Sequence, residues 1–464
     1  MSSEILRRFL ENGFQLHPEA FRLICSHKSP EKVAECVIAS LDPSVLVVQP
    51  EHVYPFIQEK SGDDIKILEN FTSSSSNASV ENFHRYFLSR YEKLKRIIEQ
   101  RGIRGREIST IKRVPRGSEV TVIGMINEIK ETSSGNILIE LEDKSGAVTA
   151  VITRESECFE RAKLLVRDEV VALRAIKQND LLIATELIEP DVRVHRLRNV
   201  QKVNSGILFL SDIHVGSNTF LREKWEKLIS WINGENGNES QRALAERIEY
   251  IIVAGDLVDG IGIYPNQDKE LEIIDIYQQY EAAAELFERI PGRIKIVVSP
   301  GNHDAVRQAE PQPPLPEEIQ KLFPKNTIFV SNPSMIEIHG LKILIYHGRS
   351  LDDIASLIPG AYRNPHVVMA ELLKKRHLSP IYGEKVPLAP EEEDLLVISE
   401  TPDVLHCGHV HTVGVGSYRG IYLINSGTWQ DQTEFQKRMN IIPTPATAVF
   451  MNLQDLSPKI LRFV

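Results

Sequence analysis

Five short motifs in the second half of the chain each place aspartate, asparagine or histidine within two residues of a glycine. Carboxylates, an amide and neutral imidazoles form the mixed ligand set that suits manganese and related first-row metals. Two divalent cations about 4 Å apart can clamp a phosphoryl oxygen and generate hydroxide near neutral pH. The residue types therefore predict a two-metal centre that acts on phosphate esters. The five motifs are Asp212-Ile213-His214, Gly255-Asp256, Gly301-Asn302-His303-Asp304, His347-Gly348 and Gly408-His409-Val410-His411.

Each motif is weak by itself, and the prediction depends on the order and position of all five. A lone Asp-x-His or His-x-His is usually incidental, and Asp304 could simply cap a following helix. Here, however, every motif follows an apolar run that is typical of a buried strand. The carboxyl ends of strands in an α/β sheet are where such sheets bind their ligands. Because side chains alternate along a strand, we expect the outer residues of Asp-x-His and His-x-His to point to one face.

The elements that must position these motifs lie in residues 201–464, where strands alternate with amphipathic helical stretches. This alternation predicts an α/β domain. The predicted strands with their polar ends are "ILFLSD" (207–212), "YIIVAGD" (250–256), "IKIVVSPGNHD" (294–304), "KILIYHG" (342–348), "VLHCGHVH" (404–411) and "IYLINSGTW" (421–429).

Residues 113–200 have a different period. Short β-rich runs are broken by Ser-Ser-Gly and Lys-Ser-Gly turns, and five strands with a polar hairpin between each pair predict a small barrel of the OB-fold type. OB-folds often bind single strands, but few aromatic residues interrupt these runs, so a structural or subunit-docking role is the safer interpretation. The runs are "EVTVIGMINEIKE" (119–131), "NILIELED" (136–143), "AVTAVITRE" (147–155), "DEVVALRAIKQ" (168–178) and "LLIATELIEP" (181–190).

The N-terminal part of the chain predicts two further segments. Residues 1–50 have apolar residues at helical spacing, which indicates a small helical module. Residues 51–112 form a polar and basic linker with a helix, and "NFTSSSSNAS" (70–79) has the composition of a flexible linker. Residues 85–116 contain eleven Lys or Arg against three Glu. Interleaved Tyr86, Phe87 and Tyr91 could stack on bases, and a solvated helix with a linker is an equal alternative.

Composition limits the classes of protein that the chain can belong to. The 464 residues are 42% hydrophobic and 25% charged, which is ordinary for a globular protein of about three domains. A net charge of −10 argues against a protein that coats nucleic acid through its bulk field, although not against a nucleic-acid enzyme.

No apolar run reaches the ~18 residues of a membrane span, and the first residues lack the features of a signal peptide, so we expect a cytoplasmic protein. The four cysteines are scattered, which predicts reduced and buried thiols.

On these motifs, residues from about 205 to 440 resemble the calcineurin-like metallophosphoesterase superfamily, whose domain is a β-sandwich flanked by helices. The resemblance implies two divalent ions, for which we expect Mn²⁺, with other first-row ions or Mg²⁺ as alternatives. It also implies that His303 protonates the leaving oxygen, a role that imidazole chemistry permits near neutral pH. The implied ligands are Asp212, His214, Asp256 and His411 for one ion, and Asp256, Asn302, His347 and His409 for the other, with Asp256 bridging.

The sequences that flank the motifs narrow the resemblance. Protein phosphatases of the superfamily carry Arg soon after the second Asp and usually Glu after Asn-His, whereas this chain has "GDLVDGIG" and "GNHDAV". The double-strand-break-repair nuclease has a His shortly after the bridging Asp, where this chain has Asp259. Nearly the whole chain instead resembles the small subunits of archaeal family D DNA polymerases, in its order of modules and in "SDIHVGS", "GDLVDGIGIYPNQ", "GNHDAVRQAEPQPP", "YHGRSLDD", "CGHVHT" and "NSGTWQ".

This second resemblance implies a 3′→5′ exonuclease that proofreads during DNA replication and pairs with a large catalytic polymerase subunit. Its DNA would be single-stranded or mismatched 3′ ends, other replication factors are possible partners, and no membrane is involved. Two alternatives are a non-catalytic assembly subunit, as in the related eukaryotic B-subunits that lost their ligands, and a stand-alone phosphodiesterase for small substrates. Because all eight family positions keep their ligand or acid chemistry, we favour the active nuclease.

Three features near the motifs have less specific interpretations. Arg307 and Arg349 flank two metal motifs and could touch phosphates or form surface salt bridges. The proline-rich stretch at 309–318 could be a stiff rim loop or an ordinary connection. The acidic run 391–394 is interpreted as a solvated helix start.

Overall fold

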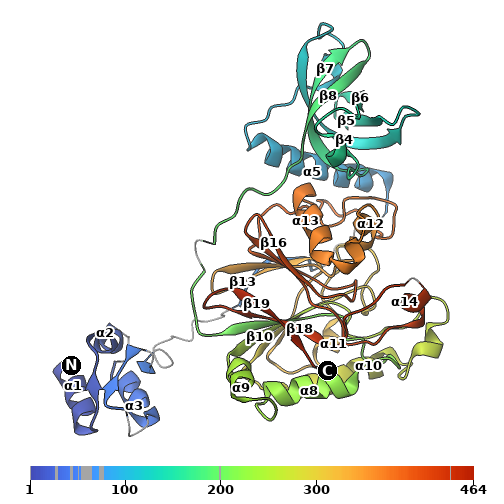
Figure 1. The fold of residues 1–464 in the computed structure, drawn as a ribbon. Helices are drawn as coiled ribbons and strands as arrows, with labels where there is room; N and C mark the ends of the chain where they lie inside the picture. Colours follow the sequence, from blue (N-terminus) through green and yellow to red (C-terminus); the bar gives the residue numbers. More distant parts are fainter. Residues whose placement is uncertain are drawn as a thin grey trace. The chain divides into compact units, whose positions relative to one another are not determined.

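A computed structural model describes residues 2–26, 30–41, 45–50, 52–53, 65–72, 78–197, 200–438 and 440–463. The chain divides into two compact units, Met1–Lys66 and Ile67–Val464, which are described separately (Figure 1). The linker predicted at 70–79 includes residues 73–77, which lie outside the described residues. Among the helices of the described residues, none is long and apolar enough to cross a membrane.

The first unit is mainly helical, as its apolar spacing predicted. Its helices bury a small core that includes Ile5, Phe9, Ile24 and Val37. Two strands of two residues each pair in parallel, and such short strands leave no period in the sequence from which they could be predicted. The elements are α1 (Ser2–Glu11), β1 (Gln15–Leu16), α2 (Pro18–Ser26), α3 (Pro30–Ser40) and β2 (Val47–Val48).

A closed five-stranded barrel, in the order β4-β5-β6-β8-β7, follows in the second unit and confirms the predicted barrel. The expectation of a hairpin between every pair is wrong at one connection. The connection between β6 and β7 contains the short helix α7 and is not a hairpin, because β6 and β7 are not neighbours in the barrel. β7 pairs with β4 and β8, and β6 pairs in parallel with β8. The elements are β4 (Glu119–Glu131), β5 (Ile137–Asp143), β6 (Gly146–Ile152), α7 (Phe159–Ala162), β7 (Val170–Gln178) and β8 (Leu181–Ile188).

The basic segment forms α5 (Val80–Glu99), whose first turn is capped by the Ser79 side chain, and α6 (Ile108–Ile111). The structure contradicts base stacking by Tyr86 and Tyr91, since Tyr86 is fully buried and Tyr91 nearly so, whereas Phe87 is only partly buried and its stacking stays a prediction. The two tyrosine rings lie on the apolar face of a long amphipathic helix. Such a helix packs its apolar face against the core of the protein. Among the basic residues of α5, Arg90 is fully buried and has a packing role, whereas Arg85 and Arg96 are exposed.

Two residues of the acidic run 391–394 are also buried, so its interpretation as a solvated helix start is wrong. Asp394 accepts a hydrogen bond from Arg90 Nε at 2.7 Å, and both side chains are 0% exposed. Glu391 pairs with Arg307 at 2.7 Å. These carboxylates tolerate burial because each has a cationic partner.

The remaining strands form two six-stranded mixed sheets, in the orders β12-β11-β10-β9-β18-β19 and β16-β17-β15-β14-β13-β3. The sheets contact each other where the rings of Phe209 and His406 meet at 4.8 Å. Their strands are β3 (Ile65–Asn70), β9 (Gly206–Leu210), β10 (Ile248–Ala254), β11 (Lys295–Ser299), β12 (Thr327–Phe329), β13 (Ser334–Ile338), β14 (Leu341–Ile345), β15 (Val404–Cys407), β16 (Gly414–Tyr418), β17 (Ile421–Asn425), β18 (Thr447–Asn452) and β19 (Ser457–Arg462).

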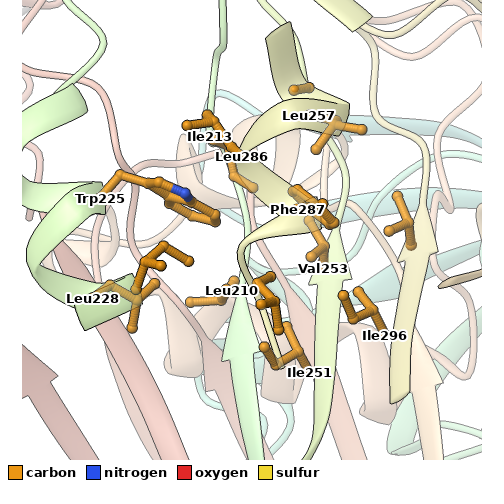
Figure 2. Close-up of a cluster of buried hydrophobic side chains, with 14 of the residues drawn as sticks. Leu210, Ile213, Trp225, Leu228, Ile251, Val253, Leu257, Leu286, Phe287 and Ile296 are labelled. Carbon is orange, nitrogen blue, oxygen red and sulfur yellow. The ribbon is translucent and has the colours of Figure 1, made fainter. Parts of the chain in front are cut away.

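Helices cover the outer faces of both sheets, so the domain is layered as the sequence led us to expect (Figure 1). On the first sheet, Trp225 of α8 and Phe287 of α10 pack over Leu210 and Val253 (Figure 2). On the second sheet, α12 and α13 pack against β14, β15 and β17. The helices are α8 (Arg222–Ile232), α9 (Glu239–Glu246), η1 (Gln267–Glu270), α10 (Ile276–Glu288), α11 (Glu317–Gln320), α12 (Leu351–Ala355), η2 (Ala361–Arg363), α13 (Pro365–Lys375) and α14 (Glu434–Arg438).

Candidate metal centre

All eight predicted site residues lie in loops that immediately follow a strand. The loops after β9, β10 and β11 come from one sheet, and those after β14 and β15 come from the other. Because the two sheets contact each other, these loops meet, and the side chains form three overlapping groups whose ligand atoms lie within 4.8 Å of one another. The groups are Asp212-His214-His411, His214-Asp256-His303 and Asp256-His347-His409.

The outer side chains of Asp-x-His and of His-x-His were expected to share a face because side chains alternate along a strand, but the backbone there is not strand. Asp212 and His214 lie beyond the end of β9, and both have left-handed φ angles, 51° and 55°. His409 and His411 repeat this after β15, with φ angles of 68° and 55°. Strand alternation is thus not the cause. Left-handed backbone costs of order 1 kcal/mol or more at a non-glycine residue and is concentrated at functional sites.

The first group joins one carboxylate to two imidazoles. His411 Nε2 lies 3.4 Å from Asp212 Oδ1, and His214 Nε2 lies 4.0 Å from the same oxygen. The two Nε2 atoms are 3.1 Å apart, so both rings present a nitrogen to one point. All three side chains are buried. One cation with oxygen and nitrogen ligands fits this donor set.

The group of Asp256, His347 and His409 also includes the Asn302 side chain. His347 Nε2 is 3.2 Å from Asp256 Oδ2 and 3.1 Å from Asn302 Oδ1, while its Nδ1 is 2.8 Å from the Ala254 carbonyl oxygen. That carbonyl can only accept, so it holds the proton on Nδ1 and leaves Nε2 as a ligand. The ring of His409 lies 5.2 Å from the ring of His347, between centroids. Asp256 Oδ2 also lies 3.8 Å from His214 Nε2, so one carboxylate oxygen is near a histidine of each candidate ion position.

His303 lies at the edge of this cluster. Its backbone N–H donates to Asp256 Oδ1 at 2.9 Å, and its Nδ1 is 2.7 Å from the Asp259 carbonyl oxygen. Its ring packs edge-on against the ring of His214, 4.8 Å away between centroids. The side chain is only partly buried, unlike most of the predicted ligands, and it lines the cavity beside the cluster.

Two glycines make room for the carboxylates. A Cβ atom on Gly301 would lie 2.2 Å from Asp256 Oδ1, and one on Gly408 would lie 2.4 Å from Asp212 Oδ2. Both distances are far below any normal contact. Glycine is therefore required at both positions by close approach to the predicted ligands.

The electrostatics of the buried groups favour ligand-competent forms for most of them. Burial alone would raise the pKa of Asp256, but the charges of His347 and His303 outweigh it and hold the pKa well below its usual value. Burial lowers the pKa of His214 and favours its neutral, metal-binding form. Burial would also lower the pKa of His347, but Asp256 raises it to about 10. A bound cation would displace that proton, as metal binding does at imidazole ligands generally.

Sequence reasoning did not assign a role to the residues that hold the ligands in place. Asp259 Oδ1 lies 2.9 Å from His214 Nδ1, and Gln267 and Gln430 each donate to this carboxylate at 3.0 Å. Asp352 Oδ2 lies 3.5 Å from His409 Nε2. Carboxylates behind metal-binding imidazoles fix the ring and its tautomer. Both carboxylates lie in stretches singled out in the sequence, Asp259 in "GDLVDG" and Asp352 in "YHGRSLDD", but only the fold shows which imidazole each one contacts.

The two arginines predicted to flank the centre differ in their surroundings. Arg307 donates to Glu391 at 2.7 Å and to the Pro311 carbonyl oxygen, and its guanidinium stacks on Phe71. This favours the salt-bridge alternative for Arg307. Arg349 donates to the backbone and side-chain oxygens of Gln308, at 3.2 and 3.1 Å. A contact of either arginine with phosphate stays a prediction.

Comparison with known proteins places the chain in a family. Residues 207–413 match the family model of the DNA polymerase alpha/epsilon B subunit. The DNA polymerase II small subunit of Archaeoglobus fulgidus is 44% identical over 468 residues, which cover 96% of this chain and 94% of that protein. The protein of the same name from Methanothermobacter thermautotrophicus is 40% identical, covering 97% and 98%. A third, from Pyrococcus abyssi, is 40% identical and covers 91% and 69%.

These similarities extend over nearly the whole chain and include the stretch that carries the candidate metal centre. The chain therefore belongs to the family of DNA polymerase II small subunits.

Proposed function

We propose that this small subunit is a two-metal 3′→5′ exonuclease that hydrolyses the terminal phosphodiester of DNA. The observation that supports the proposal is the meeting of eight carboxylate, amide and imidazole side chains from five strand ends of two sheets. A subunit used only for assembly would have no need of buried charges and left-handed backbone at the same place, because both cost stability.

The donor set fits two divalent ions. Asp212, His214 and His411 would hold one, Asn302, His347 and His409 the other, and Asp256 would bridge them. When bound, such a pair supplies Lewis acidity toward phosphoryl oxygens and lowers the pKa of water. Mn²⁺ suits the mixture of oxygen and nitrogen ligands, as do other first-row divalent ions.

His303 is proposed as the general acid. Its Nδ1 proton is held by the Asp259 carbonyl oxygen, which leaves Nε2 for the substrate. In this role Nε2 donates a proton to the oxygen that becomes the new 3′ hydroxyl, while the terminal nucleotide departs with the phosphate. The partial exposure of His303 beside the cavity suits a residue that must meet the substrate.

The architecture supports a division of the chain into four segments. We propose a helical module at 1–50, a linker with a helix at 51–112, an OB-fold at 113–200 and a calcineurin-like phosphoesterase domain at 201–464. The closed five-stranded barrel supports the OB-fold, and the two helix-flanked sheets support the phosphoesterase domain. Buried ion pairs such as Lys375 with Glu169, at 2.8 Å, hold the barrel against the two-sheet domain.

The partner would be the large catalytic subunit of the polymerase. The relatives carry the name small subunit, which implies a larger one. A net charge of −10 gives this chain little general attraction for DNA, so the partner would supply much of the DNA affinity. Mismatched 3′ ends would be preferred because fraying them breaks less base pairing.

The test is digestion of a 5′-labelled single strand and a mismatched primer–template with Mn²⁺, by the chain alone and with the large subunit. We expect a ladder that shortens from the 3′ end, faster at the mismatch. Internal cuts would indicate an endonuclease. Absence of cleavage in both preparations, despite bound metal, would support the assembly role, and cleavage of small phosphodiesters alone would support a small-substrate enzyme.

A further inference from the structure

The cavity beside the candidate metal centre has two tyrosines in its wall. The cavity has a volume of about 210 Å³ and is lined by His303, His409 and His411 together with Tyr264 and Tyr362. Among the described residues that line it, none is lysine or arginine. A substrate group held here would therefore meet the two aromatic rings, imidazoles and carboxylates, and no lysine or arginine among the described lining residues.

Tyr264 lies on the side of the general acid. Its ring centroid is 6.3 Å from that of His303, and its hydroxyl donates to Glu270 Oε2 at 3.2 Å. The side chain is half-buried. Anchoring at the hydroxyl fixes the direction of the ring and leaves part of the ring facing the cavity.

Tyr362 lies on the other side, near His409. It belongs to η2, its side chain is 38% exposed, and its hydroxyl donates to the Asp352 carbonyl oxygen at 3.4 Å. The Asp352 carboxylate in turn lies 3.5 Å from His409 Nε2. The same residue thus contacts a predicted ligand and the tyrosine.

We propose that Tyr264 and Tyr362 form a nucleobase subsite, in which the base of the 3′-terminal nucleotide stacks while its phosphate lies at the metal centre. Stacking on an aromatic ring is tolerant of sequence, because every base has a π-face. A proofreading enzyme must accept any terminal base, and two tyrosine rings meet that need, while the lining carboxylates of Asp259 and Asp352 are engaged with His214 and His409. The inference rests on the proposed exonuclease function and names where its substrate binds.

The test asks whether the effect of replacing each tyrosine depends on the presence of a base at the 3′ end. Cleavage rates of wild type, Tyr264→Leu and Tyr362→Leu are measured in Mn²⁺ on two single strands, identical except that one ends in a normal 3′ nucleotide and the other in an abasic one. On the normal end we expect each substitution to lower kcat/KM about tenfold. On the abasic end, where no base is present, the substitutions should have little effect on kcat/KM.

Tyr277→Leu is the matched control, because Tyr277 is an exposed tyrosine on α10 that does not line the cavity. It should leave both rates unchanged. If the cavity substitutions slow both ends equally, or neither, the tyrosines do not bind the base and the inference fails.

A binding measurement separates this inference from the exonuclease proposal. A strand with 3′-terminal 2-aminopurine is titrated with the full chain in Ca²⁺, and stacking should quench its fluorescence in wild type but much less in Tyr362→Leu. Quenching without cleavage in Mn²⁺ would contradict the exonuclease and keep the subsite. Binding without quenching would overturn the subsite, even if cleavage occurs.

Discussion

Asp259 Oδ1 lies 2.9 Å from His214 Nδ1, and this carboxylate is fixed by amide donors from Gln267 and Gln430. The imidazole is consequently held with Nε2 toward Asp212 and His411. Burial alone would raise the pKa of Asp259, but its hydrogen bond with His214 lowers it, so the carboxylate is charged at neutral pH. Asp259 is therefore a positioning residue for a predicted ligand.

Replacing Asp259 with Ala should weaken metal binding by about 10- to 100-fold, as loss of such supporting carboxylates does elsewhere. Asp259→Asn should lose less, because its amide oxygen can still accept from the ring. Titration calorimetry with Mn²⁺ measures both. Asp180→Asn, at an exposed turn, serves as the control, and equal affinities in all the variants would exclude a positioning role.

Gly301→Ala should disrupt the candidate metal centre although it replaces none of the predicted ligands. The new Cβ atom would approach Asp256 Oδ1 to 2.2 Å, so the carboxylate must move. We expect at least about a tenfold loss of Mn²⁺ affinity, comparable to losing a supporting residue. Gly292→Ala is the control, since nothing lies within 4 Å of its added Cβ atom. If both variants bind metal like wild type, Asp256 is not held where the structure places it.

The clustering of the five motifs was predictable from sequence because each motif is local: an apolar strand followed at once by polar residues, as after β9 and β11. The five barrel strands were predictable for the same reason. Asp394 and Tyr86 were misjudged because their partners lie far away in sequence, Asp394 pairing with Arg90 across 304 positions. Charge and aromaticity alone do not reveal whether such a partner exists.

The stabilising role of the buried Arg90–Asp394 pair can be tested directly. Arg90→Met would leave Asp394 with only His377, at 2.9 Å, as a side-chain partner among the bonds described. We expect the free energy of unfolding to fall by about 3–5 kcal/mol, measured by urea denaturation. Arg174→Met removes an exposed pair with Glu186, at 2.6 Å on the barrel, and should cost less than about 1 kcal/mol. Similar losses in both variants would contradict the distinction between the buried and the exposed pair.

Glu310 should make the stability of the metal-free protein depend on pH. Burial raises its pKa to about 7, and the Tyr346 hydroxyl donates a hydrogen bond to its carboxylate at 3.0 Å. Between pH 4.5 and 7 the folded chain keeps this proton and the unfolded chain loses it, so this group's contribution to stability falls as pH rises.

Glu310→Gln removes that dependence. Relative to wild type, the variant should gain about 2–3 kcal/mol in unfolding free energy between pH 5 and pH 8. Urea denaturation in EDTA at the two pH values measures the difference. A constant difference between variant and wild type would mean that Glu310 is ionised in the folded chain throughout this range.

The most direct test of the central claim measures metal content and 3′-end cleavage on the same preparations of wild type, His303→Ala and Asp256→Asn. We expect two bound ions and a 3′→5′ ladder in wild type. His303→Ala should keep both ions and lose about 10²-fold or more in rate, as removal of a general acid does. Asp256→Asn should lose both metal and cleavage. Wild-type cleavage by His303→Ala, or a wild-type chain that binds no ion, would contradict the two-metal nuclease.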